Sequence, residues 1–157
     1  MASTATAGRV AGLRRRKSVK TFFANSPLAF LDRGEPDIVI DMTRRGLPAE
    51  TIDFIAGLLA LPRAGVLQVI QIAASTAERR LRAGELLTAE ESDRLVRVAK
   101  ALRRAAEVFE DDIAARGWML GTVSTLGGRT PLSLLDTLEG YEMVMDTLSR
   151  IEYGVYA

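Results

Sequence analysis

The sequence predicts an all-α protein, and three features of its 157 residues support that fold class. From Leu47 onward, apolar residues recur at the spacing that places them on one face of a helix. Residues typical of helix starts and helix ends divide this pattern into segments of helical length. Alternation of apolar and polar residues, which would indicate a half-buried strand, extends over no more than a few positions, so we expect no sheet.

Two short helices are expected before residue 71. The first begins near Pro48, because a helix start tolerates the missing N–H of proline. Its apolar face consists of Ile52, Ile55, Ala56 and Leu59, spaced at i, i+3, i+4 and i+7. The dipeptide Leu61-Pro62 restarts the pattern. The apolar residues of the second helix are Val66, Leu67, Val69 and Ile70.

A third short helix is expected from Ser75 to Ala83. Ser75 and Glu78 have the spacing of a capping box, in which each side chain satisfies a backbone N–H at the helix start. Gly84 then ends the helix. Three short consecutive helices, the last two joined by a tight turn, are typical of a helix-turn-helix, although the turn from Gln71 to Ala74 lacks the glycine often found there.

The third helix is the candidate DNA-recognition helix of this motif. Arg79, Arg80 and Arg82 fall within an arc of about 160°, with Leu81 on the opposite side. Arginines on one face suit a groove lined with phosphates and base acceptors. An ordinary amphipathic helix with a solvated basic face would show the same spacing. The candidate DNA-binding residues are Thr76, Arg79, Arg80 and Arg82.

The longest helix is expected to begin after Thr88, which forms a second capping box with Glu91. Its apolar face continues for about four turns. The residues of that face are Leu95, Val98, Ala99, Leu102, Ala106 and Phe109. Asp111 and Asp112 interrupt the pattern, and adjacent acids there are more typical of a helix cap than of a catalytic carboxylate pair.

Shorter segments and a final helix come after it. One segment lies around Ile113 to Leu120, with Trp118 expected in the core. After a loop over residues 121–129, Thr130-Pro131 supplies an N-cap and a proline at the first helical position. The final helix begins near Leu138 and stops before Gly154. Its apolar residues are Tyr141, Val144, Leu148 and Ile151.

The composition argues against most enzymatic chemistry. The chain contains no His and no Cys, so it offers no His-based triad, Cys nucleophile, disulfide or zinc ribbon. Lysine occurs only at positions 17, 20 and 100, which leaves few carriers for Schiff-base or P-loop chemistry. We therefore expect a binding protein that is not an enzyme, with no catalytic residue, no metal and no cofactor.

Charge is unevenly distributed behind a formal net charge of +1. Residues 1–47 carry +5, residues 48–87 are neutral and residues 88–157 carry −4. A basic front and an acidic back suggest two partners of different character. Chance segregation together with a disordered basic arm would produce the same asymmetry.

Residues 1–46 are interpreted as a basic, flexible N-terminal arm, in which Ile38 to Ile40 could form a short extended piece. A transit peptide is conceivable on composition. The stretch from Thr21 to Leu31 makes a poor signal sequence, because it is interrupted by Asn25, Ser26 and Pro27. No apolar run approaches the ~18–20 residues of a membrane span, so we expect a soluble, cytoplasmic protein that does not bind membranes.

Four ordered motifs in the second half of the chain resemble one known family. They are TAEESDRLVRVAKALRRAAEVFED (88–111), Leu-Gly-Gly-x-Thr-Pro (126–131), Leu-Leu-Asp-Thr followed by Gly140, and Arg-Ile-Glu-Tyr-Gly (150–154). Together with Trp118, these motifs resemble the Xre/MbcA/ParS antitoxins. The resemblance implies a toxin-binding domain over residues 88–157 and an Xre-type helix-turn-helix module over 47–87. The family usually has a Pro-containing linker where this chain reads MLGTVST.

The resemblance also implies a partner and a mechanism. Antitoxins of this family pair with RES-domain toxins, which consume NAD and have an ADP-ribosyltransferase-like fold, and their C-terminal segment blocks the toxin's active-site cleft. Carried over, the toxin-binding residues are Arg150, Ile151, Glu152, Tyr153, Gly154, Val155 and Tyr156. Two tyrosines and a glycine hinge suit a concave nucleotide site.

These observations support a leading hypothesis and two alternatives. The leading hypothesis is a type II antitoxin that neutralises its RES-domain toxin sterically and represses its own operon by binding operator DNA. It would act as a homodimer within a larger toxin–antitoxin complex. One alternative is a stand-alone helix-turn-helix regulator whose C-terminal half dimerises. The other, an enzyme, would need Asp, Glu, Tyr or Ser chemistry, for which no constellation is present.

Overall fold

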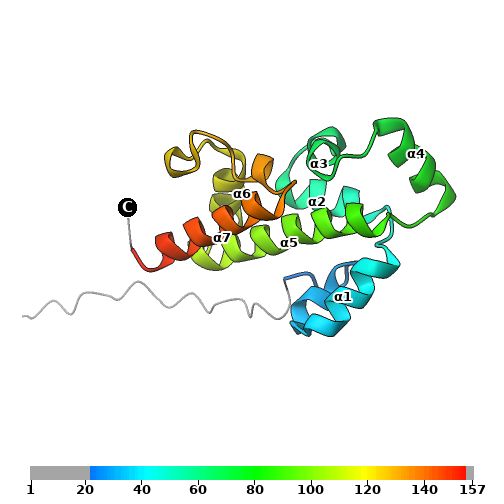
Figure 1. Ribbon diagram of the computed structural model, residues 1–157, viewed down its shortest axis with the longest axis horizontal. Helices are drawn as coiled ribbons and strands as arrows, with labels where there is room; N and C mark the ends of the chain where they lie inside the picture. The colour runs from blue at the N-terminus through cyan, green and yellow to red at the C-terminus, as the bar shows by residue number, and fades with distance from the viewer. Residues whose placement is uncertain (1–21, 155–157) are drawn as a thin grey trace, which may run out of the picture.

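The computed structural model describes residues 22–154 and, within them, an all-α fold without strands (Figure 1). The α-helices are α1 (Pro36–Arg45), α2 (Thr51–Leu59), α3 (Arg63–Ile70), α4 (Ala74–Ala83), α5 (Ala89–Phe109), α6 (Asp112–Leu120) and α7 (Leu138–Glu152). Three 3-10 turns complete the elements: η2 (Ala29–Arg33), η3 (Ser124–Leu126) and η4 (Leu132–Leu134). The predicted all-α class is confirmed.

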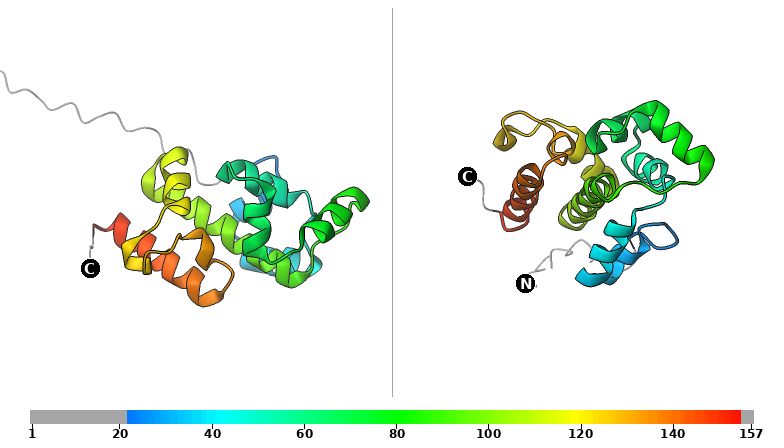
Figure 2. Two further views of the ribbon diagram at one scale, coloured as in Figure 1. Left: turned by 90° about the horizontal axis from the view of Figure 1, so that it is seen from above. Right: turned by 45° about the vertical axis from the view of Figure 1, so that its right-hand side comes forward.

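The long helix α5 is the centre of the molecule. In Figure 1, α2, α3 and α4 lie above its N-terminal half and α1 lies below it. Helix α7 runs beside α5 in the same direction, as Figure 2 shows in its right-hand view, and α6 packs on α5 as well. Among the described residues, no single helix is both long and apolar enough to cross a membrane.

One hydrophobic core connects all of these elements. It includes Leu31 near the start of the described chain, Ile55 and Ile70 from α2 and α3, and Leu148 from α7. The buried face of α5 contributes Leu95, Val96, Val98, Ala99, Ala101, Leu102 and Ala105. Since helices of both predicted modules pack on α5 and contribute to this one core, the modules are not separated by a gap in packing, and a domain boundary at residue 88 stays a prediction.

Arginine side chains on the flanks of α5 donate hydrogen bonds to backbone carbonyls of neighbouring segments and so hold those segments in place. Arg97 donates to the carbonyl oxygens of Leu135 and Asp136 at 3.1 and 3.0 Å. Arg103 donates to the Leu31 carbonyl at 2.6 Å. A guanidinium has five N–H donors and can satisfy carbonyls left unpaired where a helical turn ends. These contacts therefore hold η2 and η4 against α5.

The expectation of a flexible arm over residues 1–46 is wrong for residues 22–46, while residues 1–21 lie outside the described part. Phe23, Leu28 and Leu31 are buried, and the Phe23 N–H donates to the Asp32 carboxylate at 2.7 Å. Ile38 to Ile40 are helical in α1, not extended. Their β-branched side chains suggested a strand, but Pro36 starts a helix whose inner side packs on α5.

The capping predictions had mixed outcomes. The box formed by Thr88 and Glu91 is confirmed, with hydrogen bonds of 2.9 and 3.2 Å in the two directions. The box at Ser75 is wrong, because α4 begins one residue earlier, at Ala74, and its cap residue is Ala73. Gly84 ends α4 in the left-handed conformation as predicted, with φ +64°.

Two further boundaries depend on contacts that the sequence pattern did not reveal. Helix α2 begins at Thr51 and not near Pro48, which forms an isolated antiparallel bridge with Leu86. This bridge joins the chain before α2 to the chain after α4. Together with the hydrogen bond from the Leu47 N–H to Ser92 Oγ, at 2.9 Å, it closes the three short helices into a loop anchored on α5.

The C-terminal helices begin and end close to the predicted residues, but Trp118 and Thr130 differ from their predictions. Asp111 caps α6 by accepting hydrogen bonds from the N–H groups of Ile113 and Ala114. Trp118 is half-buried rather than in the core, and it packs on Phe109 with ring centroids 5.9 Å apart. Thr130 Oγ1 accepts from the N–H of Ser133 at 3.2 Å, but the cap residue of η4 is Pro131 and not Thr130. These caps and contacts fix the path of the chain from α5 back to the start of α7.

Candidate functional site

Helices α2, α3 and α4 form the predicted helix-turn-helix. The turn between α3 and α4 is made by Gln71 in the left-handed conformation (φ 59°), so a non-glycine residue takes the place usually held by glycine. Helix α4 projects from the body of the molecule in Figure 1. Its only buried residue is Ala77, and Leu81 packs partly on the core. Most of its surface is therefore open to a partner.

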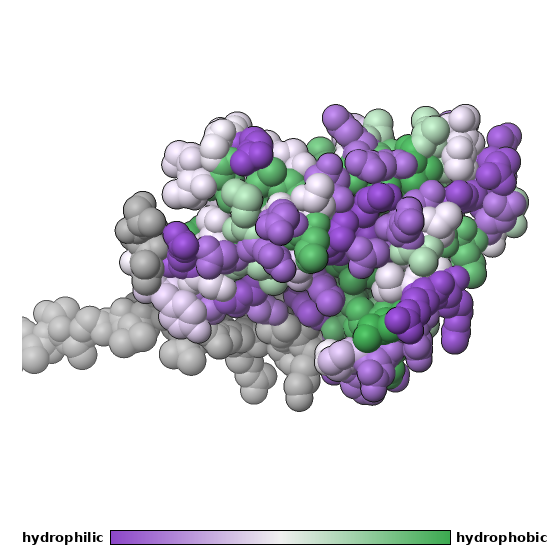
Figure 3. All heavy atoms as spheres, viewed as in Figure 1, coloured by the Kyte–Doolittle hydropathy of each residue, from purple (hydrophilic) through white to green (hydrophobic). Residues whose placement is uncertain are grey.

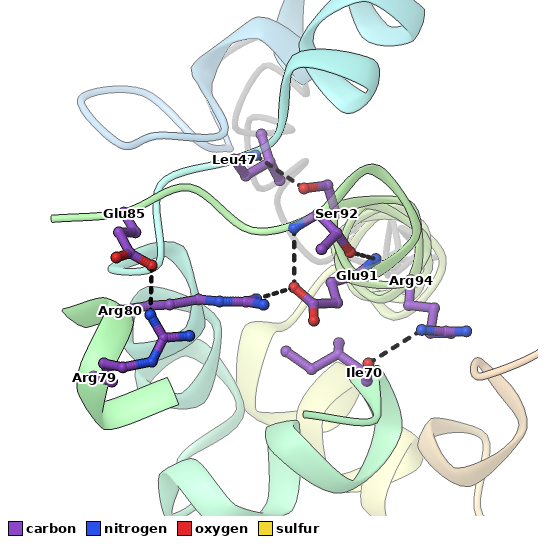
Figure 4. Close-up of polar contacts among 9 residues, drawn as sticks. Leu47, Ile70, Arg79, Arg80, Glu85, Glu91, Ser92 and Arg94 are labelled. Atoms are coloured by element: carbon purple, nitrogen blue, oxygen red, sulfur yellow. Dashed lines mark hydrogen bonds and ion pairs between the residues drawn. The ribbon is translucent and has the colours of Figure 1, made fainter. Parts of the chain in front are cut away.

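Of the four candidate DNA-binding residues, Arg79 and Arg82 are exposed and Thr76 is half-buried. The Arg79 guanidinium donates to the Glu85 carboxylate at 2.9 Å (Figure 4). Both side chains are open to solvent, at 58% and 46% exposure, so this pair is weak and can be exchanged for a phosphate contact. Arg79 and Arg82 are thus available to a nucleic acid.

Arg80 lies differently from the other arginines of α4. Its guanidinium forms an ion pair with Glu91, and the two side chains are only 14% and 13% exposed. Figure 4 shows the Arg80 guanidinium directed at Glu91. The same Glu91 carboxylate accepts from the Thr88 N–H in the capping box. Arg80 therefore connects α4 to the start of α5. The structure does not bring it together with Arg79 and Arg82 on the open surface.

Beside α4 lies a shallow hollow of about 330 Å³ lined by Arg63, Glu78, Leu81 and Arg82. Arg63 is held there by a two-pronged contact with Asp53, at 2.7 and 2.9 Å. This hydrogen bonding raises the pKa of Arg63 above its ordinary value. Because the hollow mixes both signs of charge, it is a poor site for a free anion.

The candidate toxin-binding segment begins inside α7. Arg150, Ile151 and Glu152 form the last turn of that helix, and Tyr153 caps it. Tyr153 is 77% exposed, and Gly154 has φ +66°, a left-handed conformation that turns the chain away from the helix axis. Val155 and Tyr156 lie outside the described residues. The segment is therefore a helix end followed by a turn, and not a tail throughout.

The helix end is fixed to α5 by Arg104. This side chain donates to both carboxylate oxygens of Glu152, with the longer contact at 3.3 Å, and to Glu107 at 3.4 Å. Hydrogen bonding to Glu152 is the main reason that the pKa of Arg104 is raised. Sequence reasoning did not identify Arg104, because nothing local in the sequence pairs it with a residue 48 positions away.

Among residues 22–154, no group of three or more acidic side chains is arranged to hold a metal ion. The loop over residues 121–129 could superficially suggest phosphate binding, but it is closed by a bridge between Val123 and Arg129. Arg129 Nε donates to the Leu126 carbonyl at 3.0 Å, inside the same loop. This arrangement is that of a structural turn.

Comparison with known proteins matches two family models to the chain. The antitoxin Xre-like helix-turn-helix domain matches residues 39–108, and the antitoxin Xre/MbcA/ParS C-terminal toxin-binding domain matches residues 104–154. The first match begins within α1, so it extends further toward the N-terminus than the module predicted over residues 47–87.

Three curated relatives cover most of the chain. Antitoxin Xre of Yersinia enterocolitica is 31% identical over 76% of this chain and 82% of its own length. Antitoxin Xre of Photorhabdus laumondii is 32% identical over 70% of this chain and 75% of its own length. The Prs ADP-ribosylating antitoxin of Sphingobium sp. is 24% identical over 83% of this chain and 89% of its own length.

Proposed function

The chain belongs to the Xre/MbcA/ParS family of type II antitoxins, and we propose that its toxin is a RES-domain enzyme whose active-site cleft it occludes with residues 150–156. The exposed end of α7 is the observation that carries this proposal. Tyr153 extends into solvent directly after a helix turn that Arg104 holds in place. A tyrosine side chain has few rotatable bonds, so it loses little entropy on entering a pocket.

Two observations support a partner that binds NAD. One relative is named a Prs ADP-ribosylating antitoxin, which suggests that the partner uses NAD. The acidic C-terminal half, at −4 over residues 88–157, complements a cleft built to receive the phosphates of a dinucleotide. Blocking such a cleft requires no catalytic group on the antitoxin.

Truncation tests this mechanism. A chain ending at Glu152 keeps all of α7 and the contact with Arg104 but lacks residues 153–157. We expect this variant to remain folded and to lose inhibition of NAD consumption by the proposed RES-domain toxin. Full inhibition by the truncated chain, or rescue of growth equal to that of the full chain, would contradict occlusion by this segment.

We further propose that α4 binds operator DNA and that the chain represses its own operon. The open placement of Arg79 and Arg82 supports this role. Replacing both with alanine removes two candidate phosphate contacts, so the slope of log affinity against log salt concentration is expected to fall by about 2 units. Arg80→Ala is not a suitable partner in this test, because Arg80 is tied to Glu91.

A homodimer is the proposed form on DNA, since paired half-sites match two-fold symmetry. Light scattering of the complex with operator DNA measures the number of bound chains, and a monomer on a palindromic operator would contradict the proposal. The alternative of a stand-alone regulator makes a different prediction. A regulator would show operator binding without any effect on a neighbouring toxin, whereas the antitoxin shows toxin inhibition.

A further inference from the structure

The outward face of α7 forms a continuous exposed stripe. Successive helical residues are about 100° apart, which places six exposed positions of α7 and the cap residue Tyr153 within an arc of about 140°. The seven residues are Leu138, Glu139, Glu142, Met143, Asp146, Arg150 and Tyr153. Glu152 is also exposed but lies outside this arc, where Arg104 binds its carboxylate. Residues on the opposite side, such as Val144 and Leu148, are fully buried. We call the seven residues within the arc the α7 stripe.

The α7 stripe combines acidic and large apolar side chains. It carries three acids and one base, and Arg150 is paired with Asp146 at 3.0 Å. Leu138, Met143 and Tyr153 are exposed to 58%, 40% and 77%. In Figure 3, hydrophilic side chains with apolar ones between them cover the surface over α5 and α7. Large exposed apolar residues within a charged rim are typical of a protein-binding surface.

Geometry connects this stripe to the proposed occluding segment. That segment begins at Arg150, which is itself a member of the stripe. One helical turn is about 5.4 Å, so Asp146 and Met143 lie about one and two turns behind Arg150 on the same face. When Tyr153 and the residues after it enter a cleft, these two turns must lie at its rim.

We propose that the α7 stripe is a second toxin contact, which docks on a basic surface beside the mouth of the toxin's cleft. This inference rests on the proposed function and extends it to residues outside the segment 150–156. The stripe is negatively charged and therefore calls for a basic partner surface. A cleft that admits the phosphates of a dinucleotide is expected to have such a basic rim. Met143 supplies an apolar anchor within the acidic surface.

The test measures binding of the full chain to the purified RES-domain toxin of the proposed function, at several salt concentrations. Glu142→Lys with Asp146→Lys is expected to weaken affinity by about tenfold or more and to reduce its salt dependence. Helix α1, which lies apart from α7 in the right-hand view of Figure 2, offers a matched control. Its residues Asp37 and Asp41 are also exposed and have the same i,i+4 spacing. Reversing both should leave affinity unchanged.

A second pair of variants tests the apolar anchor. Met143→Ala should weaken binding several-fold, whereas Ile40→Ala, at a similarly exposed position on α1 (44%), should not. The inference is overturned if the α7 variants bind like the unchanged chain while truncation after Glu152 abolishes inhibition. If the unchanged chain fails to bind this toxin at all, the proposed function fails, and the inference with it.

Discussion

Arg104 on α5 and Glu152 at the end of α7 are joined by two hydrogen bonds across 48 residues of sequence. The contact fixes the last turn of α7 against α5, directly before the exposed Tyr153. Both side chains are partly shielded from solvent, at 22% and 32% exposure, so the pair is stronger than an open surface ion pair. It determines where the candidate toxin-binding segment leaves the body of the protein.

Arg104→Ala is therefore expected to loosen the end of α7. Loss of the contact should lower the free energy of unfolding by about 1 kcal/mol and speed amide hydrogen exchange in residues 150–153. Arg150→Ala provides the control, because the Arg150–Asp146 pair is more than half exposed and should contribute little. Equal exchange in the Arg104 variant and the unchanged chain would contradict this role.

Arg80→Ala should destabilise the helix-turn-helix by about 2 kcal/mol, because it leaves the shielded carboxylate of Glu91 without its cation. Arg82→Ala, on the exposed face of the same helix, should change stability by less than about 0.5 kcal/mol. Urea denaturation of the two variants measures the difference. Similar losses in both would show that Arg80 has no special structural role.

Gly140→Ala should be strongly destabilising. A Cβ atom at Gly140 would lie 1.9 Å from the carbonyl oxygen of Leu134, and that neighbour is backbone that cannot turn aside. The expected loss is about 3 kcal/mol. Gly117→Ala in α6 is the matched control, because a Cβ there meets nothing within 4 Å and alanine favours a helix. In thermal unfolding, Gly140→Ala should lower the melting temperature relative to the unchanged chain, and Gly117→Ala should raise it.

The buried hydroxyl of Tyr141 should make the folded protein less stable at alkaline pH. Burial raises its pKa above the ordinary value of 10.0, although Arg103 and Arg97 oppose the shift. The folded chain then keeps this proton longer than the unfolded chain. Its contribution is complete below about pH 10 and is lost as the pH rises through the folded value.

The measurement is the urea midpoint at about pH 9 and about pH 11, in the unchanged chain and in Tyr141→Phe. The decrease should be smaller in the variant, which lacks the ionising hydroxyl. Groups other than Tyr141 are the same in both chains, so their contributions cancel in the comparison. An identical decrease in the two proteins would show that Tyr141 does not contribute.

Local signals predicted most of the helices. Pro62, Gly84, the Thr88 capping box and the Asp111 cap act within a few residues of themselves, so the sequence reveals them directly. Prediction failed at Ile38 to Ile40, where a short β-branched run is equally compatible with a strand or a helix. It failed again at Ser75, because the start of α4 depends on the turn at Gln71.

The sequence predicted different parts of the two candidate sites correctly. On α4 it correctly placed Leu81 toward the protein but grouped Arg80 with the open arginines. That grouping was incomplete because the Glu91 partner of Arg80 is on another helix. At the C-terminus it identified Tyr153 by its type and position. It also correctly placed residues 150–152 in the final helix, but it did not reveal that Arg104 fixes this helix end to α5.

The sequence by itself determined the all-α class, the order of most helices and the family. Helical periodicity and capping arise from neighbours within about four residues, and family motifs are strings of adjacent residues. The tertiary structure alone decided that residues 22–46 pack on α5, that Arg80 and Arg104 are structural connectors, and that α7 presents an acidic stripe. Such contacts join residues far apart in the chain, and only the packing around α5 brings them within bonding distance.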